Sequence, residues 1–314
     1  MRKPVLVAVP AAALLALTAC DWADMADMRG SGRYTEDFHY AHPLKAGGRL
    51  SIENFNGPIE ISSWNENSVQ ISGTKYAPTI ELRDAMKIDI SAQPDVIYIR
   101  TLRPSERRGN MGARYFIKVP RQTQLDRIVS SNGSVRVTEV EGNARVKTSN
   151  GSVRAESLRG ALDAQTSNGS IDVNAQEGGV VLRTSNGRIR AEGVRGALEA
   201  TTSNGGITAH IAKGEPGRTV RLESSNGGVD LTVDTENRND VRVSTSNGGI
   251  TVRLPEGTSG RLVAVTTNST VKSEFDVQAE GPPSKHRLEG KLGSGAGPTF
   301  DLSTTNGSIR ILRH

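Results

Sequence analysis

The chain has 314 residues, of which 35% are hydrophobic and only 4% aromatic, and its formal net charge is +5. Loss of Arg2 and Lys3 with an export signal would leave 37 basic against 34 acidic residues, a net charge of +3. This balance argues against a nucleic-acid-binding protein. The few aromatic residues argue against a sugar-stacking platform. The single cysteine, Cys20, excludes an internal disulfide.

Residues 1–19 are predicted to be a signal peptide. Arg2 and Lys3 precede an apolar stretch from Val5 to Leu17, which is too short to span a bilayer. The sequence Leu17-Thr18-Ala19-Cys20 resembles the bacterial lipobox, which implies cleavage before Cys20 and lipidation of Cys20. Several acyl chains on one residue would form a stable membrane anchor. The alternative is an ordinary exported protein with an incidental cysteine.

Residues 20–35 are predicted to be the lipidated cysteine and a tether. Asp21 resembles the signal that retains enteric lipoproteins in the inner membrane, but this rule varies among bacteria, so both membranes stay open. Residues 36–130 are predicted to be an irregular β cap and a first coil. Within them, strands are predicted at Val69–Ile71, Ile80–Leu82, Ile88–Ile90, Val96–Ile99 and Tyr115–Val119.

Residues 131–314 are predicted to be a regular solenoid, which is expected to form one continuous domain with residues 36–130. Ser-Asn-Gly recurs seven times, at first every eighteen residues, then after twenty-two and twenty-one. Such a period indicates stacked repeats. The third residue after each Asn is β-branched, and apolar residues alternate with polar ones on both sides. A structural ladder is assigned to Asn132, Asn150, Asn168, Asn186, Asn204, Asn226, Asn247 and Asn306.

The predicted fold class is all-β, a parallel β-helix or β-solenoid with two short strands in each coil of about 18 to 22 residues. Asn-Gly between alternating strands also signals a hairpin, so an antiparallel meander or barrel is the alternative. Identical residue types down each column favour the solenoid, because equivalent residues of successive coils then lie above one another. Ile309 and Ile311 fall in the final strand, which could leave the C-terminal end of the stack open to pairing.

Several segments resemble a known family. They are Gly48-Arg49-Leu50-Ser51-Ile52-Glu53-Asn54, Asn56-Gly57, Trp64, Tyr115-Phe116-Ile117-Lys118-Val119-Pro120 and the serial Ser-Asn-Gly units. They resemble the bacterial β-strand-repeat envelope family of unknown function, which is related to proteins labelled "putative auto-transporter adhesin, head GIN domain". The resemblance covers residues 36–314. It implies a β-helix-like envelope protein associated with surface adhesion or envelope stress, and it supplies no catalytic residues.

The sequence contains no recognisable catalytic, cofactor or metal motif, so no cofactor and no metal are expected. The outward positions four residues after the Asn form a possible ligand-facing column: Arg136, Arg154, Asp172 and Arg190. Arginine suits an anionic or hydroxyl-rich polymer. The alternative is a solvated surface with weak ion pairs between coils.

Three functions are compatible with this pattern. The first is a non-enzymatic, lipid-anchored and adhesin-like solenoid of the bacterial envelope that binds glycan, peptidoglycan or an envelope protein. The second is an envelope-stress signalling accessory that binds a membrane protein or a cationic peptide. The third is a polysaccharide-active β-helix enzyme, which would need clustered carboxylates. Against it, Asp163, Asp172, Glu199 and Asp230 are expected to be dispersed over different columns and coils.

Overall fold

The computed structural model describes residues 34–106, 109–214, 217–234, 239–282 and 284–314. The predicted signal peptide and Cys20 lie outside the described residues. Residues Tyr34–His314 form one compact unit. Its first strand begins at Tyr34, two residues before the start predicted for the cap.

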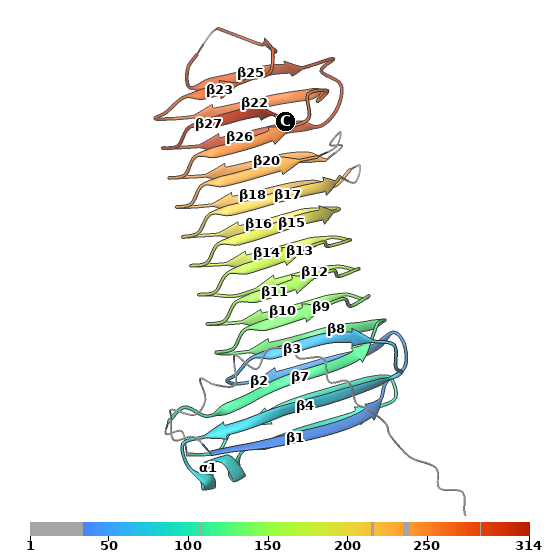
Figure 1. Cartoon of the computed structure of the whole chain (residues 1–314). Helices are drawn as coiled ribbons and strands as arrows, with labels where there is room; N and C mark the ends of the chain where they lie inside the picture. Colours follow the sequence, from blue (N-terminus) through green and yellow to red (C-terminus); the bar gives the residue numbers. More distant parts are fainter. Residues whose placement is uncertain (1–33, 107–108, 215–216, 235–238, 283) are drawn as a thin grey trace, which may run out of the picture. The chain divides into compact units, whose positions relative to one another are not determined.

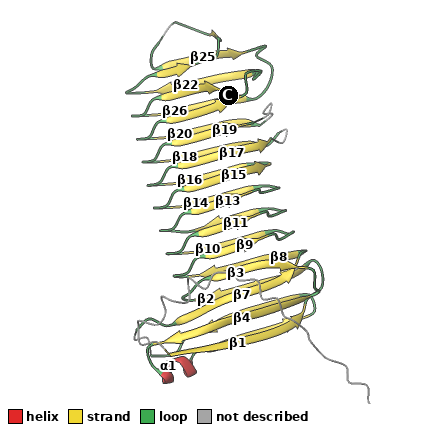
Figure 2. Ribbon diagram, in the orientation of Figure 1, coloured by secondary structure: helices red, strands yellow, loops and turns green. Residues whose placement is uncertain are grey.

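The described chain forms two long sheets (Figures 1 and 2), sheet A with 13 strands and sheet B with 14. Each regular coil contributes one strand to sheet B and then one to sheet A. The predicted parallel β-solenoid is therefore confirmed, and the antiparallel alternative is wrong for the repeats. The Asn-Gly turn joins strands of different sheets. The regular pairs are β8 (Thr123–Ser130) and β9 (Val135–Thr138), β10 (Ala144–Thr148) and β11 (Val153–Glu156), β12 (Leu162–Gln165) and β13 (Ile171–Asn174), β14 (Val180–Thr184) and β15 (Ile189–Arg195), β16 (Leu198–Thr202) and β17 (Ile207–Lys213), β18 (Thr219–Ser224) and β19 (Val229–Val233), and β20 (Asp240–Thr245) and β21 (Ile250–Leu254).

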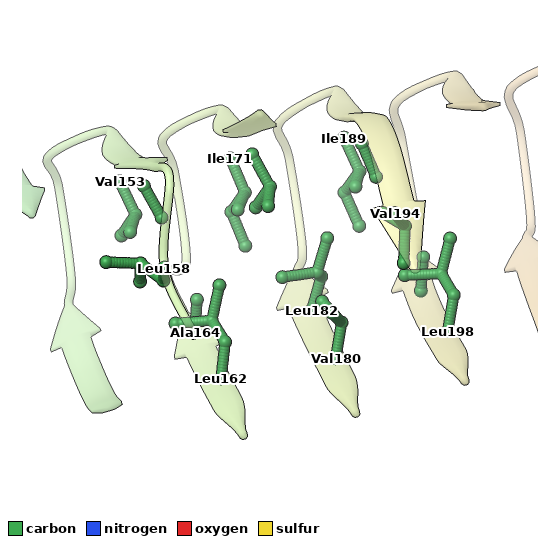
Figure 3. Close-up of a cluster of buried hydrophobic side chains, with 14 of the residues drawn as sticks. Val153, Leu158, Leu162, Ala164, Ile171, Val180, Leu182, Ile189, Val194 and Leu198 are labelled. Carbon is green, nitrogen blue, oxygen red and sulfur yellow. The ribbon is translucent and has the colours of Figure 1, made fainter. Parts of the chain in front are cut away.

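The core lies between the two sheets and repeats with the coils (Figure 3). Val153 pairs in register with Ile171, and Ile171 with Ile189, so the β-branched residues stack at about the 4.8 Å strand spacing. All three are at most 1% exposed. Small Ala155 of β11 is followed by small Ala164 of β12, whereas larger Val173 of β13 is followed by larger Leu182 of β14. This alternation lets neighbouring layers interdigitate in a thin core.

A third side of the coil connects each sheet A strand to the next sheet B strand. Isolated parallel bridges link Gln122, Glu141, Arg159, Glu177 and Arg195 in sequence along this side. Val140, Leu158 and Val194 close the core beneath it, and Gln176 takes the corresponding place in one coil. The Gln176 Nε2 atom donates to the Gly160 carbonyl at 2.6 Å, which satisfies one end of the buried amide.

The N-terminal cap is not built in sequence order. The coil of β2 (Gly48–Asn54) and β3 (Ile59–Trp64) lies between β8–β9 and the coil of β6 (Val96–Leu102) and β7 (Gly112–Pro120). Antiparallel strands complete both sheets: β4 (Ser68–Ala77) and β1 (Tyr34–Pro43) in sheet A, and β5 (Lys87–Gln93) in sheet B.

The strand predicted at Ile80–Leu82 is wrong, because these residues begin helix α1 (Ile80–Ala85). The Thr79 Oγ1 atom accepts a hydrogen bond from the Leu82 amide at 3.2 Å and caps the helix. Leu82 is the buried residue of this six-residue helix. No helix in the described part of the chain has the length and apolar character needed to cross a bilayer.

The C-terminal cap also departs from sequence order. The coil of β22 (Gly260–Thr266) and β23 (Val271–Ser273) is followed by the antiparallel strands β24 (Val277–Ala279) and β25 (Arg287–Leu292). The chain then returns, and β26 (Thr299–Thr304) and β27 (Ile309–Arg313) lie between the coil of β20–β21 and that of β22–β23. Ile309 and Ile311 lie in the final strand of the chain, β27, as expected, but this strand does not end the stack, since both of its edges are paired.

Candidate ligand-binding faces

The Ser-Asn-Gly corner is a site of close backbone packing. A Cβ on Gly187 would lie 1.8 Å from the Gly169 carbonyl oxygen of the preceding coil, so only glycine fits. The buried Thr202 Oγ1 atom donates to the Gly187 carbonyl at 2.9 Å. Equivalent bonds of 2.8 to 2.9 Å recur at the other regular corners. The recurring Thr and Gly residues are therefore explained by the architecture.

The predicted asparagines form a continuous ladder on the outside of this corner. The Asn150 Nδ2 atom donates to the Asn132 Oδ1 atom at 2.7 Å, and the next amides repeat this bond at 2.7 to 2.8 Å up to Asn306 and then Asn268. Each interior amide thus uses an acceptor and a donor within the ladder. Among the described residues there is also no group of three or more His, Cys, Asp or Glu able to hold a metal.

The predicted ligand-facing column lies on sheet A. Arg136, Arg154, Asp172 and Arg190 are in register on consecutive coils. Arg190 Nε is 3.1 Å from Glu192 Oε1, and Arg154 Nε is 4.0 Å from Glu156 Oε1. Beside the last three residues is a shallow hollow of about 250 Å³. Acidic neighbours therefore compete with any ligand for two of these arginines.

A larger groove, of about 690 Å³, crosses the starts of the sheet B strands from β8 to β20. We call it the sheet B groove. Small residues, Ala161, Gly179 and Ala197, stand just before β12, β14 and β16. Arginines line the groove at several coils, namely Arg145, Arg218, Arg221 and Arg242. Because the groove crosses the strands, a ligand lying in it would contact one coil after another.

The backbone at the small residues offers hydrogen-bond donors. In the lower coils, Gln124 Oε1 accepts from the Asn143 amide at 2.8 Å, and Asn143 Oδ1 accepts from the Ala161 amide at 2.9 Å. Ala161 and Gly179 are the next residues in the column of Gln124 and Asn143, and their side chains contain no acceptor. The amides of Gly179 and Ala197 therefore have no side-chain partner from the coil before them, which leaves them available to an oxygen-rich ligand.

The four acidic residues singled out from the sequence lie in two columns, one on each sheet. The expectation that all four lie in different columns is wrong, because Asp163 and Glu199 share one column of sheet B with Val181 between them. The Arg183 guanidinium fills the space between their carboxylates, at 3.9 Å from Asp163 and 2.8 Å from Glu199. Asp172 and Asp230 also share a column, on sheet A, with Arg190 and Thr208 between them.

The third side carries an ion-pair ladder that the repeat analysis missed. Glu141 and Arg159 are 3.1 Å apart, Arg159 and Glu177 3.3 Å, and Glu177 and Arg195 3.4 Å. The signal was present in the sequence as alternating charges eighteen residues apart. These pairs are exposed, so each contributes at most about 1 kcal/mol to stability. They link successive coils of the solenoid.

Fold and surfaces together define a parallel β-solenoid with grooves across its coils and, within the described ranges, no group of three or more His, Cys, Asp or Glu able to hold a metal. Residues 48–253 match the model of the Toastrack DUF4097 family, and the chain belongs to this family.

Two solved structures are similar to this chain. One is described as a "putative adhesin" from Bacteroides fragilis NCTC 9343, with 14% identity, 88% of this chain and 97% of that chain covered, and a TM-score of 0.41. The other is described as a "putative cell adhesion protein" from Clostridium sporogenes ATCC 15579, with 11% identity, 89% and 100% covered, and a TM-score of 0.23. At these identities the likeness concerns the fold alone. No curated protein matches the sequence.

Proposed function

We propose that this protein is a non-enzymatic, lipid-anchored solenoid of the bacterial envelope whose sheet B groove binds an extended glycan of the envelope or cell wall. The observation that carries the proposal is the direction of the groove, which runs across the coils instead of entering the core. Stacked repeats offer extended surfaces of this kind to extended partners. A polymer with regularly spaced polar groups matches a protein with regularly spaced coils.

The chemistry of the groove fits carboxylate and hydroxyl groups. Arg145 and Arg221 stand in one column, four coils apart, and Arg242 is one coil further. At about 4.8 Å per coil, Arg145 and Arg242 are separated by roughly 24 Å. Arginine can donate two parallel hydrogen bonds to one carboxylate. The unpaired amides of Gly179 and Ala197 lie between these cations and suit sugar oxygens.

Part of this positive charge is already compensated within the protein. Arg145 lies 3.8 Å from Asp163, Arg221 2.6 Å from Glu223, and Arg242 3.4 Å from Asp301. These pairs are exposed and each is weak in water. A ligand carboxylate would therefore exchange with them at little cost. The expected interaction gains strength from many contacts along the polymer rather than from one deep site.

The membrane anchor is part of the proposal and rests on the sequence around Cys20. Lipidation there would hold the solenoid at the envelope membrane, with residues 21–33 linking the anchor to β1. The non-enzymatic assignment is supported by Arg183, which lies between Asp163 and Glu199, two carboxylates that share a column of sheet B.

Binding and hydrolysis can be tested together with the Cys20→Ala chain, incubated with peptidoglycan sacculi and acidic envelope polysaccharides. A triple variant of the groove, Arg145→Ala with Arg221→Ala and Arg242→Ala, is compared with a sheet A triple variant, Arg136→Ala with Arg154→Ala and Arg190→Ala. Both lose three positive charges. We expect co-sedimentation without new reducing ends, and at least about tenfold weaker binding for the groove variant only. New reducing ends, equal losses in both variants, or no binding would contradict the proposal.

A further inference from the structure

The two ends of the stack differ in the strands that they leave unpaired. At the C-terminal end, sheet A ends with β23 and sheet B with β24, each only three residues long. At the N-terminal end, sheet A ends with β1, which has ten residues (lower end in Figure 1). Long free edges are templates for pairing with another strand, and proteins usually shorten or cover them. The N-terminal end therefore stands out as an interaction surface.

Strand β1 is exposed on its faces as well as along its edge. Phe38 is its only buried residue, and Tyr34 and Tyr40 are 47% and 39% exposed. Phe38 packs edge-on against Tyr115 with ring centroids 5.3 Å apart, which fixes the strand to the cap. All ten residues pair with β4 on one side. Among the described strands, none pairs with the other side.

The beginning of this edge is covered, but the rest is not. Arg83 of α1 donates from Nη1 to the Thr35 carbonyl at 3.1 Å, and its Nε atom lies 3.6 Å from Glu36 Oε2. The N–H and C=O groups of one residue point to the same side of an antiparallel strand, and successive residues alternate. The backbone groups of Asp37, His39 and Ala41 therefore point to the same side as Thr35, where none of the described strands meets them.

We propose that β1 pairs antiparallel with β1 of a second copy, joining the two A sheets into one continuous sheet. The strand is self-complementary in hydrogen bonding, with the carboxylate acceptors Glu36 and Asp37 in its first half and the imidazole donors His39 and His42 in its second. A two-fold pairing centred on Phe38 brings Asp37 of each strand opposite His39 of the other. Phe38 then faces Phe38 of the second copy, with Tyr40 at the diagonal position, which adds apolar contact.

The groups around these side chains leave room for such pairing. Asp37 Oδ1 accepts one bond from the Thr74 hydroxyl at 2.6 Å and keeps a second oxygen. His39 Nε2 is 3.4 Å from Gln70 Nε2, and its Nδ1 atom is free to meet the second copy. Glu36 is already held by Lys75 at 3.0 Å. Asp37 and His39 are therefore the residues expected to determine pairing.

A charge exchange between two variants tests the proposal by analytical ultracentrifugation of the Cys20→Ala chain. His39→Glu places acid opposite acid, and Asp37→Lys places base beside histidine, so each variant alone is expected to dimerise at least about tenfold more weakly than the parent. Mixing the two restores opposite charges and is expected to restore a heterodimer. Thr208→Glu, which adds a negative charge in the middle of sheet A, should leave the dimer unchanged.

The melting temperature of every variant is measured to show that it folds. The proposal is overturned if the parent is monomeric at all accessible concentrations, or if neither edge variant weakens a dimer that does form. It is also overturned if dimers form only after residues 1–33 are removed, because that segment would then be the occupant of the edge. Glycan binding by the groove is measured separately, so the two proposals can fail independently.

Discussion

At the scale of single residues, the Ser-Asn-Gly tripeptide lets successive coils pack closely. Its Gly allows the carbonyl group of the preceding coil to approach, and its Asn continues an amide ladder. The Thr two residues before the Asn donates a hydrogen bond to a glycine carbonyl of the preceding coil from inside the core. The sequence showed that these columns were structural, because the residue types repeat. It did not show which atoms meet, since that depends on the offset between successive coils.

The glycine of the corner offers a sharp test. Gly187→Ala would place a Cβ 1.8 Å from the Gly169 oxygen, so we expect the free energy of unfolding to fall by more than about 3 kcal/mol. Gly179→Ala is the matched control, because its Cβ would meet nothing within 4 Å and its neighbours in the column are alanines. This variant should stay within about 1 kcal/mol of the parent. Equal denaturant midpoints for the two variants would contradict the corner geometry.

Tyr115 makes stability depend on alkaline pH. Burial raises the pKa of Tyr115 well above its ordinary value near 10, although the 2.6 Å hydrogen bond with Thr101 acts in the opposite direction. The neutral phenol therefore stabilises the fold fully below pH 10, and this contribution is lost as the pH rises above 10, at up to about 1.4 kcal/mol per pH unit.

We therefore expect the unfolding free energy, measured by denaturant titration between pH 9 and 11, to fall less steeply for Tyr115→Phe than for the parent. The variant also leaves the Thr101 hydroxyl without its partner, which lowers stability by a constant amount. The slopes against pH are compared for this reason, and identical slopes would show that Tyr115 does not ionise on unfolding.

At the scale of elements, prediction succeeded where residues repeat and failed where they do not. The strands of the regular coils follow from period-two alternation. Helix α1 was missed because Ile80-Glu81-Leu82 alternates like a strand over three residues, while the Thr79 cap acts only once the helix exists. The order of the last coils was missed because the sequence gives no preference for Asn306 over Asn268 as the neighbour of Asn247.

Because the last coil lies between two others, we expect the stability of the C-terminal cap to depend on it. Strand β26 pairs with β20 on one side and β22 on the other, so removal of residues 299–314 leaves a gap in both sheets. We expect amides in β22 and β25 to lose hydrogen-exchange protection, while those in β10 to β17 keep it. Full protection of β22 in the truncated protein would mean that it docks directly on β20, against this account.

At the scale of the whole molecule, the sequence identified outward arginines but selected the column on sheet A. The sheet B groove was missed because its floor consists of Ala161, Gly179 and Ala197, whose small size carries no chemical signal in a repeat. Only the pairing of coils shows that these residues follow one another and that arginines flank them.

The anchor at Cys20 is also tested on the whole protein. Cys20→Ala removes the sulfur that would carry the lipid, so this chain should be exported but recovered in the soluble fraction after cell lysis. The parent should stay with the membrane pellet after washing with high salt, since acyl chains resist salt. Recovery of the variant with the washed pellet would contradict lipidation as the means of attachment.

The most direct measurement of the central claim is hydrogen–deuterium exchange of the Cys20→Ala chain with and without the envelope glycan that it co-sediments with. The account predicts slower exchange at the starts of the sheet B strands, around Ala161, Gly179 and Ala197, and no change on the outer face of sheet A. Protection centred on Arg136, Arg154 and Arg190 instead, or no protection of the sheet B groove at saturating glycan, would contradict it.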